Sequence, residues 1–225
     1  MIGALKTIPQ IEKSKIVVAF SGGEDSAFLL ASLLALKKKF GFSVQPVHIN
    51  HKYLKEDDFY VKIATAAALG LGKECVVLEA QPVPEKTNLE NWMREERYRL
   101  LEEYRAQNEA DFIAVAHHKK DLAESVLMHI FRGCGLKGLR GMEIQRKKII
   151  RPLLFVDKED ITRLLQSTKI PYYNDKLNYS LVKNRSKIRF ELLPQLKENF
   201  DPQIEKHLAN LSQIVSRSLK EKERE

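Results

Sequence analysis

The sequence predicts an α/β fold in which a doubly wound, mostly parallel sheet of five strands is followed by a small helical C-terminal segment. Short apolar runs rich in β-branched residues alternate with longer stretches of helical periodicity, the pattern of a parallel sheet with helices on both faces. After Pro152 only helical patterns follow. Ligands bind such sheets beyond the carboxyl ends of the strands, so polar residues that follow a strand are the first site candidates.

In the first part of the chain, each brief apolar run is followed by a segment whose apolar residues recur every three or four positions. The run KIVVAF is short and β-branched, as a buried strand is, and Gly70 can end the second helix. The predicted strands are 15–20, 43–50, 74–80, 111–117 and a short fifth at 148–154. The predicted helices between them are 26–40, 56–69, 88–107 and 121–131.

Three helices are predicted after the sheet. Asp157 is a favourable N-cap for the first, Pro194 interrupts the second, and Pro202 suits the first turn of the last. Their expected spans are 157–168, 183–200 and 202–219. We therefore expect three regions: a catalytic core at 1–155, a helical extension with a basic stripe at 156–200, and a C-terminal helix with a charged tail at 201–225.

Composition limits the classes of protein. The 225 residues carry a net charge of +8, and all of it lies in residues 137–225, because residues 1–136 hold 18 basic and 18 acidic side chains. A neutral front and a basic back suggest chemistry in the first part and a polyanion at the second, although a solvated basic face without a partner stays open. No apolar run is long enough to span a membrane, and the N-terminus lacks a signal-type segment. The two cysteines, Cys75 and Cys134, form no CxxC pair, so we expect a cytoplasmic protein without a local cysteine metal site.

The stretch SGGEDS at 21–26 follows the first predicted strand directly. Two glycines permit a sharp turn and let a phosphate approach the main chain, and the next helix offers free N–H groups and the positive end of its dipole. Ser21 and Ser26 add hydroxyl groups. Asp25 suits a phosphate site only if a cation accompanies the phosphate, so we interpret it as a Mg²⁺ ligand. The chain contains no GxxxxGK followed by Ser or Thr, and SGGEDS does not match GxGxxG, so this loop has neither the usual P-loop pattern nor the dinucleotide pattern.

SGGEDS resembles the PP-loop of the N-type ATP pyrophosphatases, whose fold is described as adenine nucleotide alpha-hydrolase-like. These enzymes hold the pyrophosphate of ATP in the loop and transfer AMP to a substrate oxygen, after which a nucleophile displaces AMP. Between about Lys15 and Leu208, further segments resemble the tRNA(Ile)-lysidine synthetases in family order. They are NLENWMREERYRLL (88–101), AHHKKDLAESVLMHIFRGCGLKGLRGM (116–142), RPLL (151–154), IPYYNDKLN (170–178) and NRSKIRFELLP (184–194).

The resemblance implies a ligase that uses ATP and Mg²⁺. Such an enzyme adenylates the C2 oxygen of the wobble cytidine in the CAU anticodon of an isoleucine tRNA. Free lysine then attacks C2 and AMP leaves, which gives lysidine and AUA decoding. The implied partners are this tRNA and free lysine in the cytoplasm, with no membrane; whether the chain forms a homodimer is left open.

The resemblance also implies site residues. Those implied for nucleotide and pyrophosphate binding are Ser21, Gly22, Gly23, Glu24, Asp25, Ser26, His48 and Asn50, with His51 beside them. Those implied for catalysis are Asp25, Arg97, His117, Asp121 and Glu124, with His118 in the same cluster. Those implied for substrate or RNA contacts are Arg94, Arg132, Gly133, Gly135, Lys183, Arg185, Lys187 and Arg189. The metal ligand is Asp25, with Asp121 as a second candidate.

Structural explanations stay open beside these roles. Arg94 and Arg97 are also spaced for surface pairing with glutamates. Asp121 and Glu124 share a helix face, where they suit the cationic end of lysine, a second Mg²⁺, or simple capping of the helix.

The chain departs from the family pattern at four places. Lys120 stands where many members have an aspartate, Ser125 replaces a threonine, and Leu177 replaces a serine. Longer relatives continue into further domains that help grip the tRNA, so a minimal form, a fragment and a relative with a shorter substrate all stay open.

Other functions remain as alternatives. A PP-loop tRNA cytidine thiolase would need catalytic cysteines, for which Cys134 alone is weak support. A glutamine-dependent ligase would need a glutaminase half, of which the sequence has no sign. A truncated or non-catalytic module that binds ATP and RNA is favoured only by Lys120 and by the missing domains.

Overall fold

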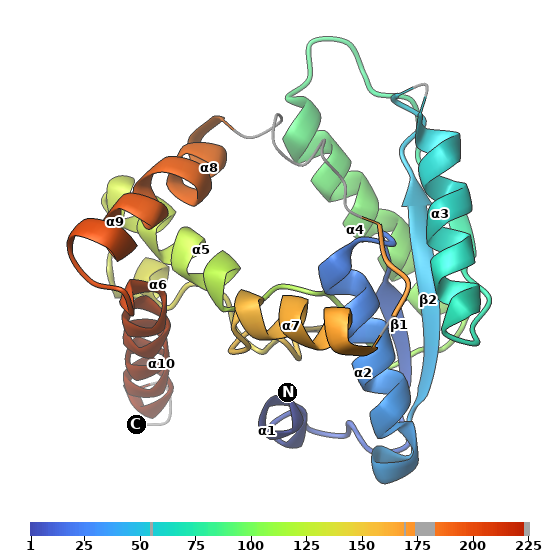
Figure 1. Ribbon diagram of the computed structural model, residues 1–225, viewed down its shortest axis with the longest axis horizontal. Coiled ribbons are helices and arrows are strands. Elements are labelled where there is room, and N and C mark those ends of the chain that lie inside the picture. Colours follow the sequence, from blue (N-terminus) through green and yellow to red (C-terminus); the bar gives the residue numbers. More distant parts are fainter. Residues whose placement is uncertain (55, 169, 174–182, 223–225) are drawn as a thin grey trace.

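The computed structural model describes residues 1–54, 56–168, 170–173 and 183–222, and it confirms the predicted mostly parallel sheet (Figure 1). The strands are β1 (Lys15–Ala19), β2 (Ser43–Asn50), β3 (Val76–Glu79), β4 (Phe112–Ala114), β5 (Gln145–Arg146) and β6 (Ile149–Ile150). Their order is β3-β2-β1-β4-β6-β5, and every neighbouring pair is parallel except β5 with β6. The five parallel strands are the predicted ones. The sixth strand, β5, was not predicted, because its two residues, Gln and Arg, are polar and form no apolar run.

The strand order reverses between β1 and β4. From β1 the chain builds outward through β2 and β3 on one side, and β4 and β6 complete the other side. A crevice at such a reversal, beyond the carboxyl ends of the strands, is where open α/β sheets bind ligands. The segments after β1 and β4 therefore flank the expected site.

The helices match the predicted ones closely and add short elements. They are α1 (Ile2–Lys6), α2 (Glu24–Phe40), α3 (Asp57–Gly70), α4 (Leu89–Gln107), α5 (Lys119–Phe131), α6 (Leu136–Leu139), α7 (Lys158–Thr168), α8 (Lys183–Lys187), the π-helix η2 (Ile188–Leu192), α9 (Leu193–Asn199) and α10 (Ile204–Lys222). The predicted helix at 183–200 is thus divided into α8, η2 and α9. Pro194 has no N–H to donate to the preceding turn, and the wider π turn lies directly before it.

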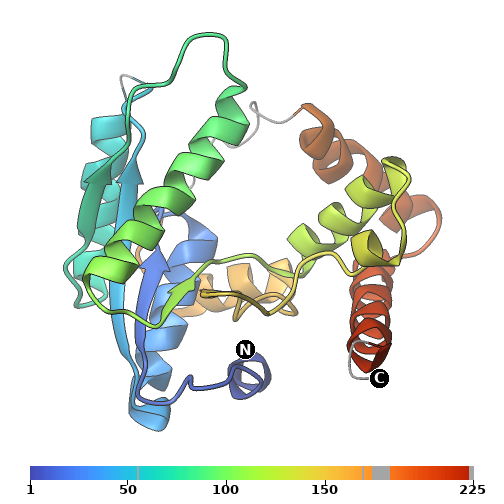
Figure 2. The same ribbon diagram turned by 180° about the vertical axis from the view of Figure 1, so that it is seen from behind.

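Helices cover both faces of the sheet, as alternating side chains of β1 require. Ile16 and Val18 pack into the core under α2 and α3, whereas Val17 faces the opposite cluster with Leu101 of α4. Figures 1 and 2 show the two sides: α2 and α3 lie in front of the strands in the first view, and α4 crosses them in the view from behind.

The C-terminal helices form a separate apolar cluster with α5. Leu122 and Val126 of α5 pack with Leu193 and Leu208 of the later helices, and α8, α9 and α10 lie to one side of the sheet with α5 between (Figure 1). The division at 155/156 stays a prediction; α5, which lies before it, packs with the helices that follow it. None of the helices in the described ranges is long and apolar enough to cross a membrane.

Candidate active site

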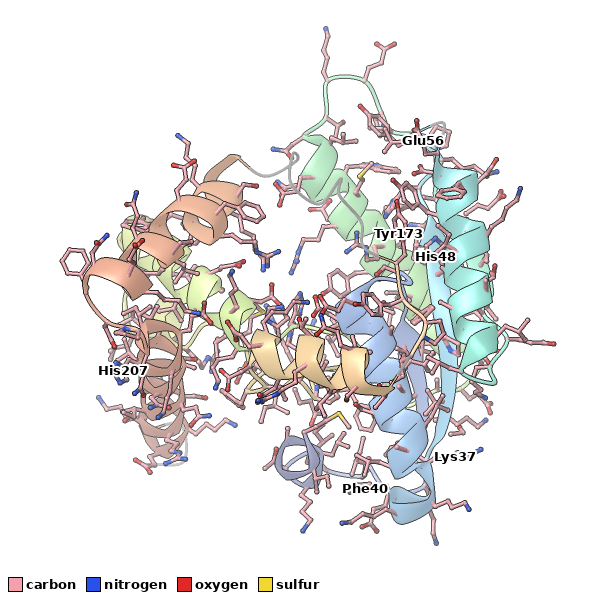
Figure 3. All side chains as sticks on the ribbon, in the orientation of Figure 1. Lys37, Phe40, His48, Glu56, Tyr173 and His207 are labelled. Atoms are coloured by element: carbon pink, nitrogen blue, oxygen red, sulfur yellow. The ribbon has the colours of Figure 1, made fainter. Side chains whose placement is uncertain are left out.

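The loop after β1 turns sharply into α2 and is built around Gly22. Its φ of +80° lies in the left-handed region, and a Cβ there would lie 2.9 Å from the Cα of Ala64 in α3. Glycine alone fits this backbone. Tyr173 donates its N–H to the carbonyl of Gly22 at 2.8 Å, so a later segment runs beside the loop. Figure 3 shows Tyr173 and His48 near the N-terminal end of α2, with Lys37 and Phe40 at its far end.

Hydroxyl groups stiffen the loop from within. Ser21 Oγ lies 3.1 Å from Ser26 Oγ, and the Ser26 hydroxyl donates to the carbonyl of Gly23 at 2.9 Å. Gly23 is the N-cap of α2 and provides no side chain to the free N–H groups of the first turn. Those groups and the helix dipole favour an anion at this end.

Two carboxylates, those of Glu24 and Asp25, lie in the first turn of α2 directly after the loop. Glu24 and Asp25 both contact Lys158 of α7, at 2.6 and 2.5 Å, and Asp25 Oδ2 lies 3.7 Å from His118 Nε2. Lys158 was missed from the sequence. It follows RPLLFVD at a helix start, a place that gives no sign of contact with residues more than 130 positions earlier.

The end of β2 supplies neutral imidazoles. Burial lowers the pKa of His48, although its hydrogen bond to the Phe20 carbonyl opposes the shift. The carbonyl can only accept, so Nδ1 of His48 carries the proton and Nε2 keeps a lone pair. Burial lowers the pKa of His51 to about 4. The side chain of Asn50 accepts from the N–H of Lys52 and so also orders the turn after the strand.

Two arginines of α4 lack carboxylate partners among the described residues, whereas Arg99 and Arg105 pair with glutamates of the same helix. In the part of the chain that the structure describes, neither Arg94 nor Arg97 forms a hydrogen bond or an ion pair, and Arg94 lies over the ring of Tyr98 at 5.2 Å. The alternative left open for both residues, surface pairing with glutamates, is therefore wrong. Arg97 retains accessible surface, yet surrounding protein lowers its pKa, with help from Arg94. Accessible but crowded by protein, Arg97 is suited to an incoming anion.

His117, after β4, is held in one tautomer. Arg151, from the RPLL motif, donates its Nε–H to His117 Nδ1 at 3.2 Å and an Nη1–H to the Glu143 carbonyl at 2.9 Å. Burial lowers the pKa of His117 to about 3, so the ring is neutral and its proton is on Nε2. His117 therefore presents an N–H donor, which suits contact with a phosphate oxygen better than proton abstraction.

Asp121 and Glu124 are bound by two arginines of the C-terminal helices. Arg185 donates to Glu124 at 2.8 Å and to Asp121 at 2.9 Å. Arg189 donates to Glu124 at 2.5 and 3.1 Å and to Asp121 at 2.6 Å. Burial alone would raise the pKa of Asp121, but the neighbouring histidines and arginines hold it far below its usual range. We call these four residues the charge cluster; it joins α5 to α8 and η2.

The charge cluster corrects the expected basic stripe. Residues two apart do not share a helix face, so Arg185 and Arg189 face inward while Lys187 lies exposed on another side. Lys187 and Arg132 line a groove of about 500 Å³ between the end of α5 and the C-terminal helices. Among the predicted RNA-contacting cations whose side chains the structure describes, these two line the groove.

The remaining predicted residues have varied positions. Gly133 has a φ of +71° and open space beside it, and Gly135 is the N-cap of α6. Lys183 begins α8, and the predicted D-x-x-N segment with Leu177 lies outside the described residues. Within the described ranges, no group of three or more His, Cys, Asp or Glu side chains is arranged to hold a metal ion.

Comparisons with known proteins agree with this geometry. The family model of the PP-loop domain matches residues 3–196. A tRNA(Ile)-lysidine synthase of Thermosipho africanus is 37% identical over 191 residues, which is 83% of this chain and 45% of that protein. One from Clostridioides difficile is 34% identical over 204 residues, or 88% of this chain and 44% of that protein. The chain thus spans about half the length of these relatives.

A solved structure shares the fold. The U34-tRNA thiolase NcsA from Methanococcus maripaludis, with its 4Fe–4S cluster, superposes with a TM-score of 0.77 and covers 95% of this chain and 77% of its own, at 19% sequence identity. Because the PP-loop model spans most of the sequence and the loop, sheet order and switch point agree with it, this chain belongs to the PP-loop domain family.

Proposed function

We propose that this chain ligates lysine to C2 of the wobble cytidine in the CAU anticodon of an isoleucine tRNA, using ATP. The observation that carries the proposal is the similarity to proteins named tRNA(Ile)-lysidine synthase over more than four fifths of the chain. The proposal also covers the partners, which are this tRNA and free lysine, and a location in the cytoplasm.

The PP-loop has the geometry to hold the β and γ phosphates of ATP. The uncapped start of α2 offers N–H groups, and the Ser21 and Ser26 hydroxyls lie beside them. Mg²⁺ commonly takes one or two protein carboxylates and completes its coordination with water and substrate phosphates, so Asp25 with Glu24 fits a Mg²⁺–nucleotide complex. The ion would stabilise charge on the leaving pyrophosphate.

The reaction needs alignment and charge stabilisation more than covalent help. In the first step, the C2 oxygen bonds to the α phosphorus and the bond to pyrophosphate breaks. Arg97 and the N–H of His117 have no hydrogen-bond partner among the described residues, so both are suited to bind the phosphates. In the second step, the lysine amine bonds to C2, its proton leaves, and AMP departs with the oxygen.

The sharpest test is an assay with ATP, Mg²⁺, labelled lysine and an isoleucine tRNA with a CAU anticodon. The control is the same tRNA with uridine at the wobble position. Label in the cytidine tRNA alone, with AMP release, is expected. Incorporation into both tRNAs, or into neither while ATP is bound, would refute the proposed reaction. Asp25→Asn should abolish pyrophosphate release without loss of fold.

Thiolation of a tRNA base is the second candidate, favoured by the fold of the thiolase. It requires reactive sulfur or a cysteine-held cluster, and the sequence has two cysteines. Burial raises the pKa of Cys75 to about 11, which suppresses its thiolate. Pyrophosphate release that depends on a sulfur donor instead of lysine would establish this alternative.

A further inference from the structure

Lys158 bridges the two acidic residues of the PP-loop. Its Nζ lies 2.5 Å from Asp25 Oδ1 and 2.6 Å from Glu24 Oε2. The three side chains are 27%, 34% and 16% exposed, in that order, so the contact is partly shielded from solvent. One ammonium group therefore serves two carboxylates at the entrance of a loop suited to phosphate.

A second ion pair joins the same group of helices close to this lysine. Lys119, the first residue of α5, contacts both carboxylate oxygens of Asp157 at 2.7 Å. Asp157 directly precedes Lys158, which begins α7. The first turns of α2, α5 and α7 are thus joined by two lysines, which together contact three carboxylates.

The charges of Glu24 and Asp25 explain why a lysine beside them would favour phosphate binding. Glu24 and Asp25 place two negative charges in the first turn of α2, where a polyphosphate would otherwise be attracted by the helix N-terminus. Like charges at this range repel, and partial burial strengthens the repulsion. Lys158 neutralises half of that charge, and burial, which alone would lower its pKa, is outweighed by the two carboxylates.

We propose that Lys158 is a built-in counter-cation of the PP-loop. It holds Asp25 and Glu24 when no metal is bound, which allows a polyphosphate to approach, and it competes with a divalent cation for Asp25. The inference rests on the proposed use of ATP by this loop. Lys158 is then a positioning residue. Its removal should lower the affinity for metal-free ATP and raise the affinity for a divalent cation.

The first measurement is ATP affinity by equilibrium dialysis of the full chain, in EDTA and in saturating Mg²⁺. Lys158→Met should weaken metal-free ATP binding by about tenfold or more, which corresponds to about 1.4 kcal/mol. In saturating Mg²⁺ the loss should be several-fold smaller, because the ion then provides the positive charge. Lys158→Arg should restore most of the metal-free affinity.

The second measurement is Mn²⁺ binding to the nucleotide-free chain, followed by electron paramagnetic resonance. Lys158→Met should bind Mn²⁺ severalfold more tightly than the wild type, since Asp25 and Glu24 lose their competing ammonium. If Lys158 had a merely structural role, its replacement would not weaken ATP binding and strengthen Mn²⁺ binding at the same time.

Lys119→Met is the matched control. It also breaks a lysine–aspartate contact between these helices and should lower the melting temperature to a similar extent, while the ratio of ATP affinities with and without Mg²⁺ stays at the wild-type value. The same ratio in Lys158→Met and wild type, or an altered ratio in Lys119→Met, would overturn the inference. If the wild type binds no ATP at all, both the proposed function and this inference fail. If the wild type binds ATP and Lys158→Met has the same dependence on Mg²⁺, only the role of Lys158 is refuted.

Discussion

Glu124 is the residue whose replacement tests the charge cluster most directly. Its side chain is fully buried and accepts three of the five hydrogen bonds in the cluster, two from Arg189 and one from Arg185. Glu124→Gln preserves the shape but leaves two guanidinium groups facing the single carboxylate of Asp121. The cluster then carries a net positive charge in a largely buried place.

The expected cost is large. Removing one partner of a buried ion pair typically costs about 3–5 kcal/mol, and a unit-charge pair about 4 Å apart at an effective dielectric of about 20 has an energy of about 4 kcal/mol. Total stabilities of about 5–15 kcal/mol are usual. Glu124→Gln should therefore remove a substantial fraction of the free energy of unfolding, measured by urea denaturation followed by circular dichroism.

Two comparisons make the prediction refutable. Glu79→Gln removes an exposed ion pair, in which Lys52 Nζ lies 2.6 Å from Glu79 Oε2. This loss should lower the free energy of unfolding by only about 0–1 kcal/mol. Glu124→Gln combined with Arg189→Met restores neutrality, so the double variant should lose less than the sum of the two single losses by about 0.5–3 kcal/mol. A loss below about 1 kcal/mol for Glu124→Gln, or strict additivity, would show that the cluster does not act as a charge-balanced unit.

Three further predictions follow from individual groups. Because burial lowers the pKa of His117 to about 3, the unfolded chain binds a proton between about pH 6.5 and pH 3 that the folded chain does not. The free energy of unfolding should thus fall as pH drops through this window, by up to about 1.4 kcal/mol per pH unit, and His117→Asn should flatten the slope measured by urea titration. Gly22→Ala should lower stability by about 1–3 kcal/mol, since the new Cβ meets Ala64 at a positive φ; an unchanged melting temperature would contradict this. Lys187→Glu should weaken tRNA binding and lower its salt slope by about 1, and an unaltered slope would place the RNA elsewhere.

The fold and the location of the site could be predicted because both follow from local patterns. Alternating strands and helices placed SGGEDS and the histidine-rich segment beyond β1 and β4, and the strand order put these two segments at the switch point. A short strand such as β5 has no pattern of its own. β5 pairs with β6 across a turn in which Lys147 has a φ of 54°. Neither the pairing nor the positive φ can be predicted from the periodicity of apolar residues.

Side-chain partners could not be predicted, because they depend on contacts between distant segments. Arg185 and Arg189 have the appearance of RNA-binding residues in a basic C-terminal region, yet they bind carboxylates 61 to 68 positions away. Their spacing contained part of the answer, since residues four apart share a helix face and the intervening Lys187 does not. Charge reversal at Arg185 or Arg189 therefore tests stability before it tests RNA binding.

The charged groups at the switch point also connect the core under α2 with the apolar cluster that α5 forms with the C-terminal helices. Lys158 contacts Asp25, His118 lies 3.7 Å from Asp25 and 3.4 Å from Asp121, and Asp121 binds the arginines of α8 and η2. Each carboxylate in this series has a cationic or imidazole neighbour on both sides. A change of charge at the PP-loop, such as the arrival of a polyphosphate, must therefore alter the balance at His118 and Asp121. Because the same Asp121 anchors the C-terminal helices, we expect substitutions in the charge cluster to alter ATP affinity, measured by equilibrium dialysis, as well as stability.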